Sequence, residues 1–229
     1  MICISGYLMK ELVQSIDDDM SVEERNALSI AYRYVVGSKR ASWRNISAIR
    51  DKKRDEKYEE CVAEYRAVIE KELSDVCMSL LTLLNDTIIP RATTVYSKVF
   101  FHKMAGDYWR YMAEFATNDL KNRESSLKSY ECAVELAKGL PPTDANKLGL
   151  HLNYSVFYYE IMMEPEHACK LAKNAFDEAI SELDSLSEES YRESTMIMQI
   201  LRDNISLWTS DMVENGDEEE EEEDDENSQ

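Results

Sequence analysis

The chain has little of what a turn-rich β-protein needs, because only six Gly and four Pro occur in 229 residues. Residues that favour helices, such as Leu, Glu, Lys and Ala, are plentiful instead. An all-α protein is therefore the default expectation. The length allows one large domain or two small ones, with a substantial hydrophobic core.

Long apolar runs are also missing. The best candidate, Val76 to Leu84, is interrupted by Ser79 and Thr82, and a membrane-spanning helix needs roughly 18 or more apolar residues. The N-terminal residues MICISGYLM have neither the basic start nor the cleavage site of a signal peptide. We therefore expect no membrane association and a cytoplasmic location, with the nucleus as a second compartment.

Positive charge is scarce, with 26 basic against 46 acidic residues and a net charge of −20. Such a balance argues against nucleic acid as a partner. The segment after Asp211 holds eleven acidic residues and no basic one, so the rest of the chain still carries about −9. Beyond Val213 the sequence cannot bury apolar surface, and we expect it to be disordered.

Motifs for catalysis or metal binding are absent from the sequence. There is no GxGxxG, P-loop, HExxH or G-x-S-x-G, and the three His have no ligand-like spacing. We expect no enzyme, no cofactor and no metal site. Five cysteines without a CxxC pattern predict free thiols in a reducing compartment: Cys3, Cys61, Cys77, Cys132 and Cys169.

Apolar residues recur at spacings of three and four along most of the chain, which is typical of amphipathic helices. Ser21 to Glu24 forms a capping-box pattern that marks one helix start. Short connections favour antiparallel neighbours in a stack of αα-hairpins. We expect about eight helices, over residues 7–16, 22–50, 56–87, 93–117, 125–138, 143–163, 165–183 and 188–208.

The second of these predicted helices carries a cationic stripe. Arg33, Gly37, Arg40 and Arg44 follow one another at intervals of four, three and four residues, so they share one face. Guanidinium groups suit bidentate contact with phosphate or carboxylate, which points to an anion site. A solvated face whose arginines pair with nearby acids explains the pattern equally well.

The helix predicted over residues 93–117 repeats the theme. Lys103 and Arg110 lie seven residues apart with Asp107 between them, so one carboxylate can hold both cations, and Tyr111 follows immediately. Taken alone, this spacing favours an intrahelical salt-bridge ladder.

Two long stretches resemble the signatures of one family. RNALSIAYRYVVGSKRASWRNISAI (Arg25 to Ile49) and YRESTMIMQILRDNISLWTSD (Tyr191 to Asp211) are similar to the two signatures of the 14-3-3 proteins. This resemblance implies stacked antiparallel helices around a concave groove. It also implies a non-catalytic adaptor that binds extended segments of client proteins containing phosphoserine or phosphothreonine. We accordingly divide the chain into a divergent segment (1–20), a 14-3-3-like domain (21–211) and an acidic tail (212–229).

The resemblance also implies roles for individual residues. Phosphate binding would fall to Arg33, Arg40, Lys103, Arg110 and Tyr111. The peptide main chain would be bound by Asn153 and Asn204, and Glu160 would be a groove acid that orients the arginines. The apolar wall would consist of Leu152, Val156, Ile197, Ile200 and Leu207.

Family members form dimers through their first helices. The receiving positions match Ser42, Ile46, Ile49, Tyr65 and Glu72, whereas Val68 replaces a usual Lys. About 20 residues precede the capping box at Ser21, so we expect the family's first helix to be absent or replaced by MICISGYL. The resemblance therefore implies a homodimer or heterodimer. The short N-terminal segment puts this dimer in question.

Two further hypotheses remain open. The acidic tail could compete for the basic groove, or a phosphorylated Ser228 could occupy it. A helical-repeat scaffold of the tetratricopeptide kind, binding acidic or C-terminal peptides without phosphate, is the alternative function, although no sustained 34-residue period is present.

Overall fold

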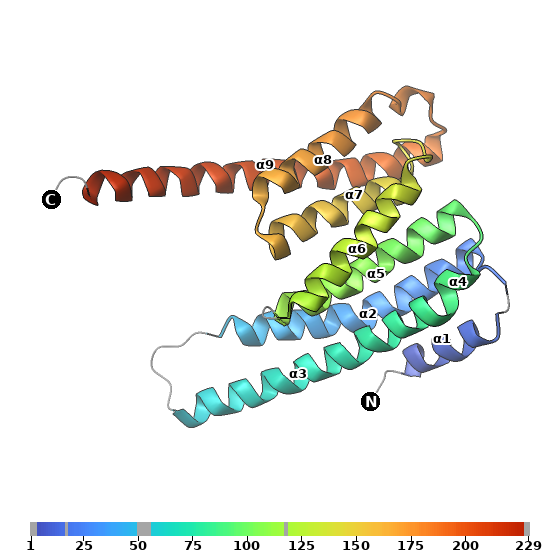
Figure 1. Cartoon of the computed structure of the whole chain (residues 1–229), viewed down its shortest axis with the longest axis horizontal. Helices are drawn as coiled ribbons and strands as arrows, with labels where there is room; N and C mark the ends of the chain where they lie inside the picture. The colour runs from blue at the N-terminus through green and yellow to red at the C-terminus, as the bar shows by residue number, and fades with distance from the viewer. Residues whose placement is uncertain (1–3, 17, 50–55, 117–118, 227–229) are drawn as a thin grey trace. The chain divides into compact units, whose positions relative to one another are not determined.

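The computed structural model describes residues 4–16, 18–49, 56–116 and 119–226. These residues form helices and connections, with no β-strand among them, which confirms the all-α prediction. In chain order (Figure 1) the elements are α1 (Ile4–Gln14), α2 (Val22–Ser47), α3 (Glu56–Leu83), η1 (Leu84–Ile88), α4 (Ile89–Arg91), α5 (Val95–Phe115), α6 (Leu120–Ala137), α7 (Ala145–Phe157), η2 (Tyr158–Met162), α8 (Pro165–Ile180), η3 (Leu183–Ser185) and α9 (Glu188–Glu226).

The chain divides into two compact units, residues 1–133 and 134–229. In the first unit α2 lies beside α3, α1 packs on α2, and α5 packs on α3 (Figure 1). In the second unit α7, α8 and α9 pack against one another. Helices that are adjacent in sequence are therefore neighbours in space, as the short connections predicted.

The core of the first unit is built from the apolar faces of α1, α2, α3 and α5. Burying one large aliphatic side chain contributes about 1.5–3 kcal/mol, so this cluster is a main source of stability. Its fully buried members include Leu28 and Tyr32 from α2, Leu73 and Leu80 from α3, and Phe101 from α5.

The second unit has a different kind of core. Four buried alanines, Ala168, Ala172, Ala175 and Ala179, follow one another on α8 at intervals of four, three and four. Such a stripe of small residues lets neighbouring helices approach closely. Larger residues on those neighbours fill the space, including Leu148 and Phe157 on α7 and Leu201 and Trp208 on α9.

Three helix starts predicted from sequence are confirmed. The Ser21 capping box is complete, because its hydroxyl accepts from the Glu24 amide at 3.2 Å and the Glu24 carboxylate accepts from the Ser21 amide at 2.8 Å. Asp144 caps α7 by accepting from two backbone amides. Pro165 stands in the first turn of α8.

Two boundaries differ from the prediction. Helical structure passes through Pro90 and ends at Arg91. The π-helical turn η1 comes directly before the proline, and its changed winding lets the helix continue although Pro90 has no N–H to donate. Helix α6 begins at Leu120 rather than near residue 125, because the Asp119 carboxylate accepts from the Lys121 amide and starts the helix early.

The two ends of the chain also differ from expectation. Residues 4–14 form a full helix, α1, which packs on α2. At the other end α9 does not stop near residue 208 but continues to Glu226, a segment without proline in which Glu, a good helix former, predominates. The predicted connection at residues 50–55 and the tail hypothesis for Ser228 lie outside the described residues.

A single carboxylate joins the segment before α2 to the segment before α5. Asp19 accepts hydrogen bonds from the Thr93 amide at 2.9 Å, the Thr93 hydroxyl at 3.0 Å and the Thr94 amide at 3.2 Å. Burial raises the pKa of this carboxyl, but the bonds from Thr93 and Thr94 outweigh it and leave the pKa below its ordinary value.

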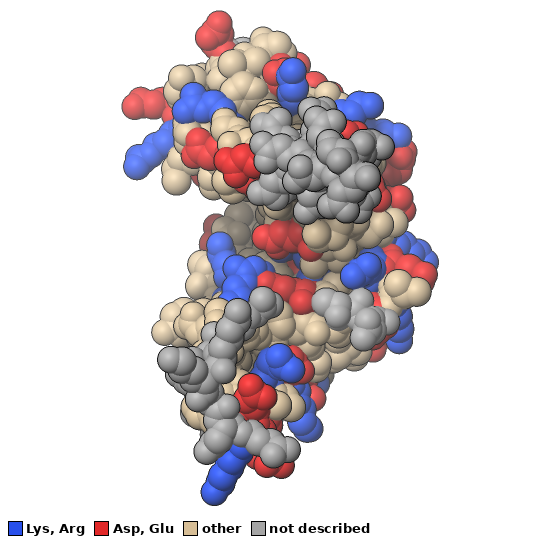
Figure 2. Space-filling view, turned by 90° about the vertical axis from the view of Figure 1, so that its left-hand side faces the viewer, with Lys and Arg blue, Asp and Glu red and all other residues tan. Residues whose placement is uncertain are grey.

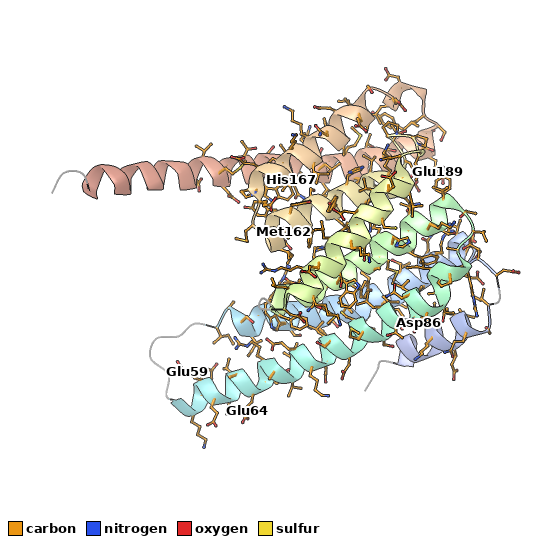
Figure 3. All side chains as sticks on the ribbon, viewed as in Figure 1. Glu59, Glu64, Asp86, Met162, His167 and Glu189 are labelled. Atoms are coloured by element: carbon orange, nitrogen blue, oxygen red, sulfur yellow. The ribbon has the colours of Figure 1, made fainter. Side chains whose placement is uncertain are left out.

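The reversal between η2 and α8 uses a left-handed residue, Met163, with φ of 58°. Figure 3 labels its neighbours Met162 and His167 on either side of this turn. The His167 ring stacks on Tyr158 with centroids 3.9 Å apart, and its Nδ1 lies 3.4 Å from the Glu164 carboxylate. These contacts hold a backbone conformation that non-glycine residues adopt only at some cost.

Two glycines in helix interiors have opposite surroundings. A methyl group at Gly106 on α5 would meet the Tyr130 ring at 2.8 Å, so α5 and α6 require glycine there for close approach. A methyl group at Gly37 on α2 would meet nothing within 4 Å. Glycine in a helix interior costs about 1 kcal/mol relative to alanine, and at Gly37 no close contact with a described residue compensates for this cost.

Among the described residues, Cys61, Cys77, Cys132 and Cys169 are free thiols. The same residues include no helix that is both long and apolar enough to cross a membrane. They also contain no group of His, Cys, Asp or Glu side chains arranged to hold a metal ion.

Candidate functional site

The Tyr111 ring on α5 makes cation–π contacts with two arginines from different helices. The guanidinium carbon of Arg40, on α2, lies 4.0 Å from the ring centroid, and that of Arg110, on α5, lies 4.8 Å from it. A cation over an aromatic face gains about 0.5–2 kcal/mol, depending on its desolvation. Three predicted phosphate-binding residues are thus brought together within the first unit.

Glu114 holds the α2 arginines against α5. Its carboxylate accepts from Arg40 Nε at 2.8 Å and from Arg44 Nε at 2.6 Å. Burial raises the pKa of Glu114, but the hydrogen bonds and charges of Arg40 and Arg44 outweigh this, so its pKa lies below the ordinary value. The carboxylate is ionised at neutral pH and fixes the spacing of the two guanidinium groups.

Asp107 holds two cations of α5 in place, as Glu114 does for the α2 arginines. Its carboxylate lies 3.0 Å from Lys103 Nζ and 3.6 Å from an Arg110 nitrogen, so the predicted ladder is present. The Tyr130 hydroxyl, from α6, donates to Asp107 at 2.6 Å and accepts from Arg110 Nε at 3.1 Å. Burial raises the pKa of Asp107, but Lys103, Arg110 and the Tyr130 hydrogen bond together bring it below the ordinary value.

Arg33 lies apart from this network. Its side chain is exposed on α2, one helical turn before Gly37, and it makes no ion pair with any residue that the structure describes. It shares the stripe with Arg40 and Arg44, so a ligand bound along α2 can reach it.

The cluster has more positive than negative charge. Within the described part of the first unit, four cations (Arg40, Arg44, Lys103 and Arg110) share ion pairs with two carboxylates, Asp107 and Glu114, and Arg33 adds a fifth positive charge to the α2 stripe. Each guanidinium has five N–H donors, more than one carboxylate can accept. The ion pairs that the charge pattern also predicted therefore exist, and Arg40 has more N–H donors than its bond to Glu114 uses. Basic side chains lie beside acidic ones over the described part of the face in Figure 2.

The remaining predicted groove residues lie in the second unit. Asn153, Leu152 and Val156 are partly buried on α7, and Glu160 is exposed in η2. Helix α9, which packs against α7, carries the others: Asn204 and Ile197, which are partly buried, and Ile200 and Leu207, which are exposed. The main-chain and apolar-wall roles of these residues stay predictions.

The predicted dimer positions lie on or just after α2 and on α3. Ser42 is exposed, Ile46 packs partly against the core, and Ile49 follows the end of α2. On α3, Tyr65 is exposed and Glu72 pairs with Lys39 of α2. Their role in self-association also stays a prediction.

Two residues of the cluster were not predicted from the sequence. Glu114 lies four residues after Arg110, so helical spacing could have suggested it. Tyr130 gave no such signal, because it reaches Asp107 from another helix. A third contact, in the second unit, was also missed: the Tyr159 hydroxyl donates to Asp211 at 2.5 Å, while its ring stacks on Trp208.

Comparison with known proteins identifies the family. The family model described as "14-3-3 protein" matches residues 7–209. The chain belongs to the 14-3-3 family. A 14-3-3-like protein of Chlamydomonas reinhardtii is 56% identical over 211 residues, which cover 89% of this chain and 82% of that protein. The checkpoint signal transducer rad25 of Schizosaccharomyces pombe is 54% identical over 213 residues (90% and 78%), and 14-3-3 protein epsilon of Drosophila melanogaster is 55% identical over 206 residues (87% and 79%).

As a 14-3-3 protein, the molecule is a signalling adaptor that acts on client proteins and not an enzyme. Membership also supports dimer formation at the level of the family. The family match starts at residue 7, not at 21, so it includes much of the segment that we expected to diverge. Buried Val13 and Met20 show that this segment contributes to the 14-3-3 core.

Proposed function

We propose that this 14-3-3 protein binds client segments that are phosphorylated on Ser or Thr, and that it distinguishes them from the unmodified segments. The meeting of Arg40 and Arg110 on the Tyr111 ring carries this proposal. Both guanidinium groups contact the same ring, and each suits the planar, bidentate geometry of a phosphoryl group.

The charges favour a phosphate over a carboxylate. A phosphoserine carries about −1.5 to −2 charges and three strong acceptor oxygens. Each charge-assisted hydrogen bond contributes about 1.5–3 kcal/mol, and several of them compete against the desolvation of the cations. A difference of a few kcal/mol between phosphorylated and unmodified segments follows, which is enough for a switch.

The second unit carries residues that suit the main chain of an extended segment. Asn153 and Asn204 carry amide groups that can each serve one backbone N–H and one C=O, so they suit an extended peptide without reading its side chains. Leu152, Val156 and Ile200 would supply the apolar contacts. We also propose that the protein acts in the cytoplasm and the nucleus.

The test compares two labelled peptide pools that share degenerate flanks and differ only at a fixed central phosphoserine or serine. Wild-type protein should bind the phosphoserine pool at least tenfold more tightly. Arg40→Ala should remove most of this preference. Arg110→Lys keeps a positive charge beside buried Asp107, so it preserves folding while losing the bidentate fork.

Arg66→Ala on α3 is the matched control, because Arg66 is an exposed arginine that pairs only with Glu70 in the described region. It should leave the preference unchanged. Equal binding of both pools by the wild type would refute the proposal and favour an adaptor that binds peptides independently of phosphate.

A further inference from the structure

The part of the chain that the structure describes gives no packing reason for glycine at position 37. It lies in the middle of α2 with ordinary helical backbone, since no glycine among the described residues has a positive φ. A methyl group there would meet nothing within 4 Å. Glycine destabilises a helix relative to alanine, so the reason for glycine at this position lies outside the chain.

The face around Gly37 shows what could lie there. At about 100° per residue, Arg33 and Arg40 flank Gly37 on one side of α2. Ile30 and Tyr34 flank it on the other side and are 58% and 80% exposed. These two side chains, one helical turn apart, form a small exposed apolar strip that a bound molecule can cover. Gly37 therefore marks the line between the cationic stripe and an exposed apolar strip.

We propose that the backbone of the bound client segment passes directly over Gly37, in the space that a β-carbon would fill. The inference rests on the proposed phosphopeptide function. A phosphoserine is short, because only Cβ and the ester oxygen separate its phosphorus from the main chain. A phosphate held by Arg40 therefore brings the client backbone down onto α2, where glycine permits the closest approach.

A second copy of this chain explains the glycine less well. The predicted dimer positions Ser42 and Ile46 lie roughly 140° and 180° around α2 from Gly37. A partner seated on them would cover the opposite side of the helix. The cationic stripe, by contrast, adjoins Gly37 directly and continues to the Arg40 and Tyr111 contact.

The experiment separates folding from binding through Gly37→Ala. Because the methyl group meets nothing in the free protein, the thermal midpoint should rise by about 2–4 °C from the better helix propensity. The affinity for the phosphoserine peptide pool should nevertheless fall at least tenfold. Ala41→Gly, the converse exchange one turn later on α2, should lower the midpoint and leave the affinity unchanged.

Each other outcome has a clear meaning. Unchanged phosphopeptide affinity in Gly37→Ala would overturn the inference while leaving the phosphate preference of the wild type intact. A lower midpoint would overturn it too, because the chain itself would then need the glycine. Loss of self-association in sedimentation, with unchanged peptide affinity, would assign the face to a second copy. If the wild type showed no phosphate preference, the proposed function itself would have failed.

Discussion

Tyr130 and Asp107, from α6 and α5, share a hydrogen bond of 2.6 Å in the interior of the first unit. The same phenol oxygen accepts from Arg110 at 3.1 Å, so one residue fixes both an acid and a cation of the candidate phosphate site. Tyr130→Phe should lower the free energy of unfolding by about 1.5–3 kcal/mol, because the bond involves charged groups. Urea denaturation measures this loss.

The same variant should also weaken phosphopeptide binding, since Arg110 loses the contact that orients its guanidinium group. Tyr191→Phe on exposed α9 surface is the control and should change neither quantity. A stability loss with unchanged affinity would show that Tyr130 supports the fold and does not position Arg110.

Gly106→Ala tests the close approach of α5 and α6. The new methyl group would meet buried Tyr130 at 2.8 Å, and overpacking of this kind costs about 1–3 kcal/mol. We expect a lower thermal midpoint in calorimetry, opposite in sign to the effect of Gly37→Ala. Equal midpoints for the two variants would contradict the packing described here.

Stability should depend on acid through Glu114. Its pKa in the folded state lies below the ordinary value of a glutamate, because the hydrogen bonds and charges of Arg40 and Arg44 outweigh the effect of burial. A carboxyl with a lowered folded pKa stabilises the protein fully above its unfolded pKa, and this contribution is lost as the pH falls toward the lowered value. Glu114→Gln should therefore lose less stability than wild type as the pH falls below the ordinary pKa of a glutamate, as followed by urea titrations at each pH.

The acidic tail should act on binding through charge alone. Deleting residues 214–229 should tighten phosphopeptide binding several-fold at low salt, with the gain shrinking as salt screens the charges. Replacing the six glutamates at 218–223 with glutamine keeps the length and should reproduce the gain. If only the deletion did so, charge competition would be excluded.

Self-association should depend on the α3 surface. Tyr65 is 58% exposed there, and Tyr65→Arg should shift the protein toward monomer in sedimentation velocity. Because linking two sites raises avidity by roughly 10² to 10⁴, a doubly phosphorylated peptide should lose affinity while a singly phosphorylated one does not. Leu120→Arg, an exposed control on α6, should change neither measurement.

The sequence was sufficient for whatever depends on local spacing. The Ser21 capping box, the Asp107 ladder and the proline at the start of α8 all follow from residues within one helical turn. The two signature stretches likewise indicated the family correctly. Arg40 and Arg110 were paired by that resemblance, and the structure shows them meeting at Tyr111.

Contacts between different helices could not be predicted from the sequence. The role of Tyr130 depends on how α6 crosses α5, and periodicity within one helix carries no such information. The π-helical turn before Pro90 was missed because helix rules place a boundary at proline, whereas a local change of winding can carry the helix past it. The role of Gly37 needed coordinates, since only they show that its neighbourhood is empty.

The three hydrogen bonds that Asp19 accepts from Thr93 and Thr94 have a consequence at a distance. They tie the beginning of the chain to the base of α5, the helix that bears Arg110 and Tyr111. A displacement of the segment before α2 would therefore move the first turn of α5 as well, so the position of Arg110 and Tyr111 depends on a carboxylate more than 90 residues earlier in the chain.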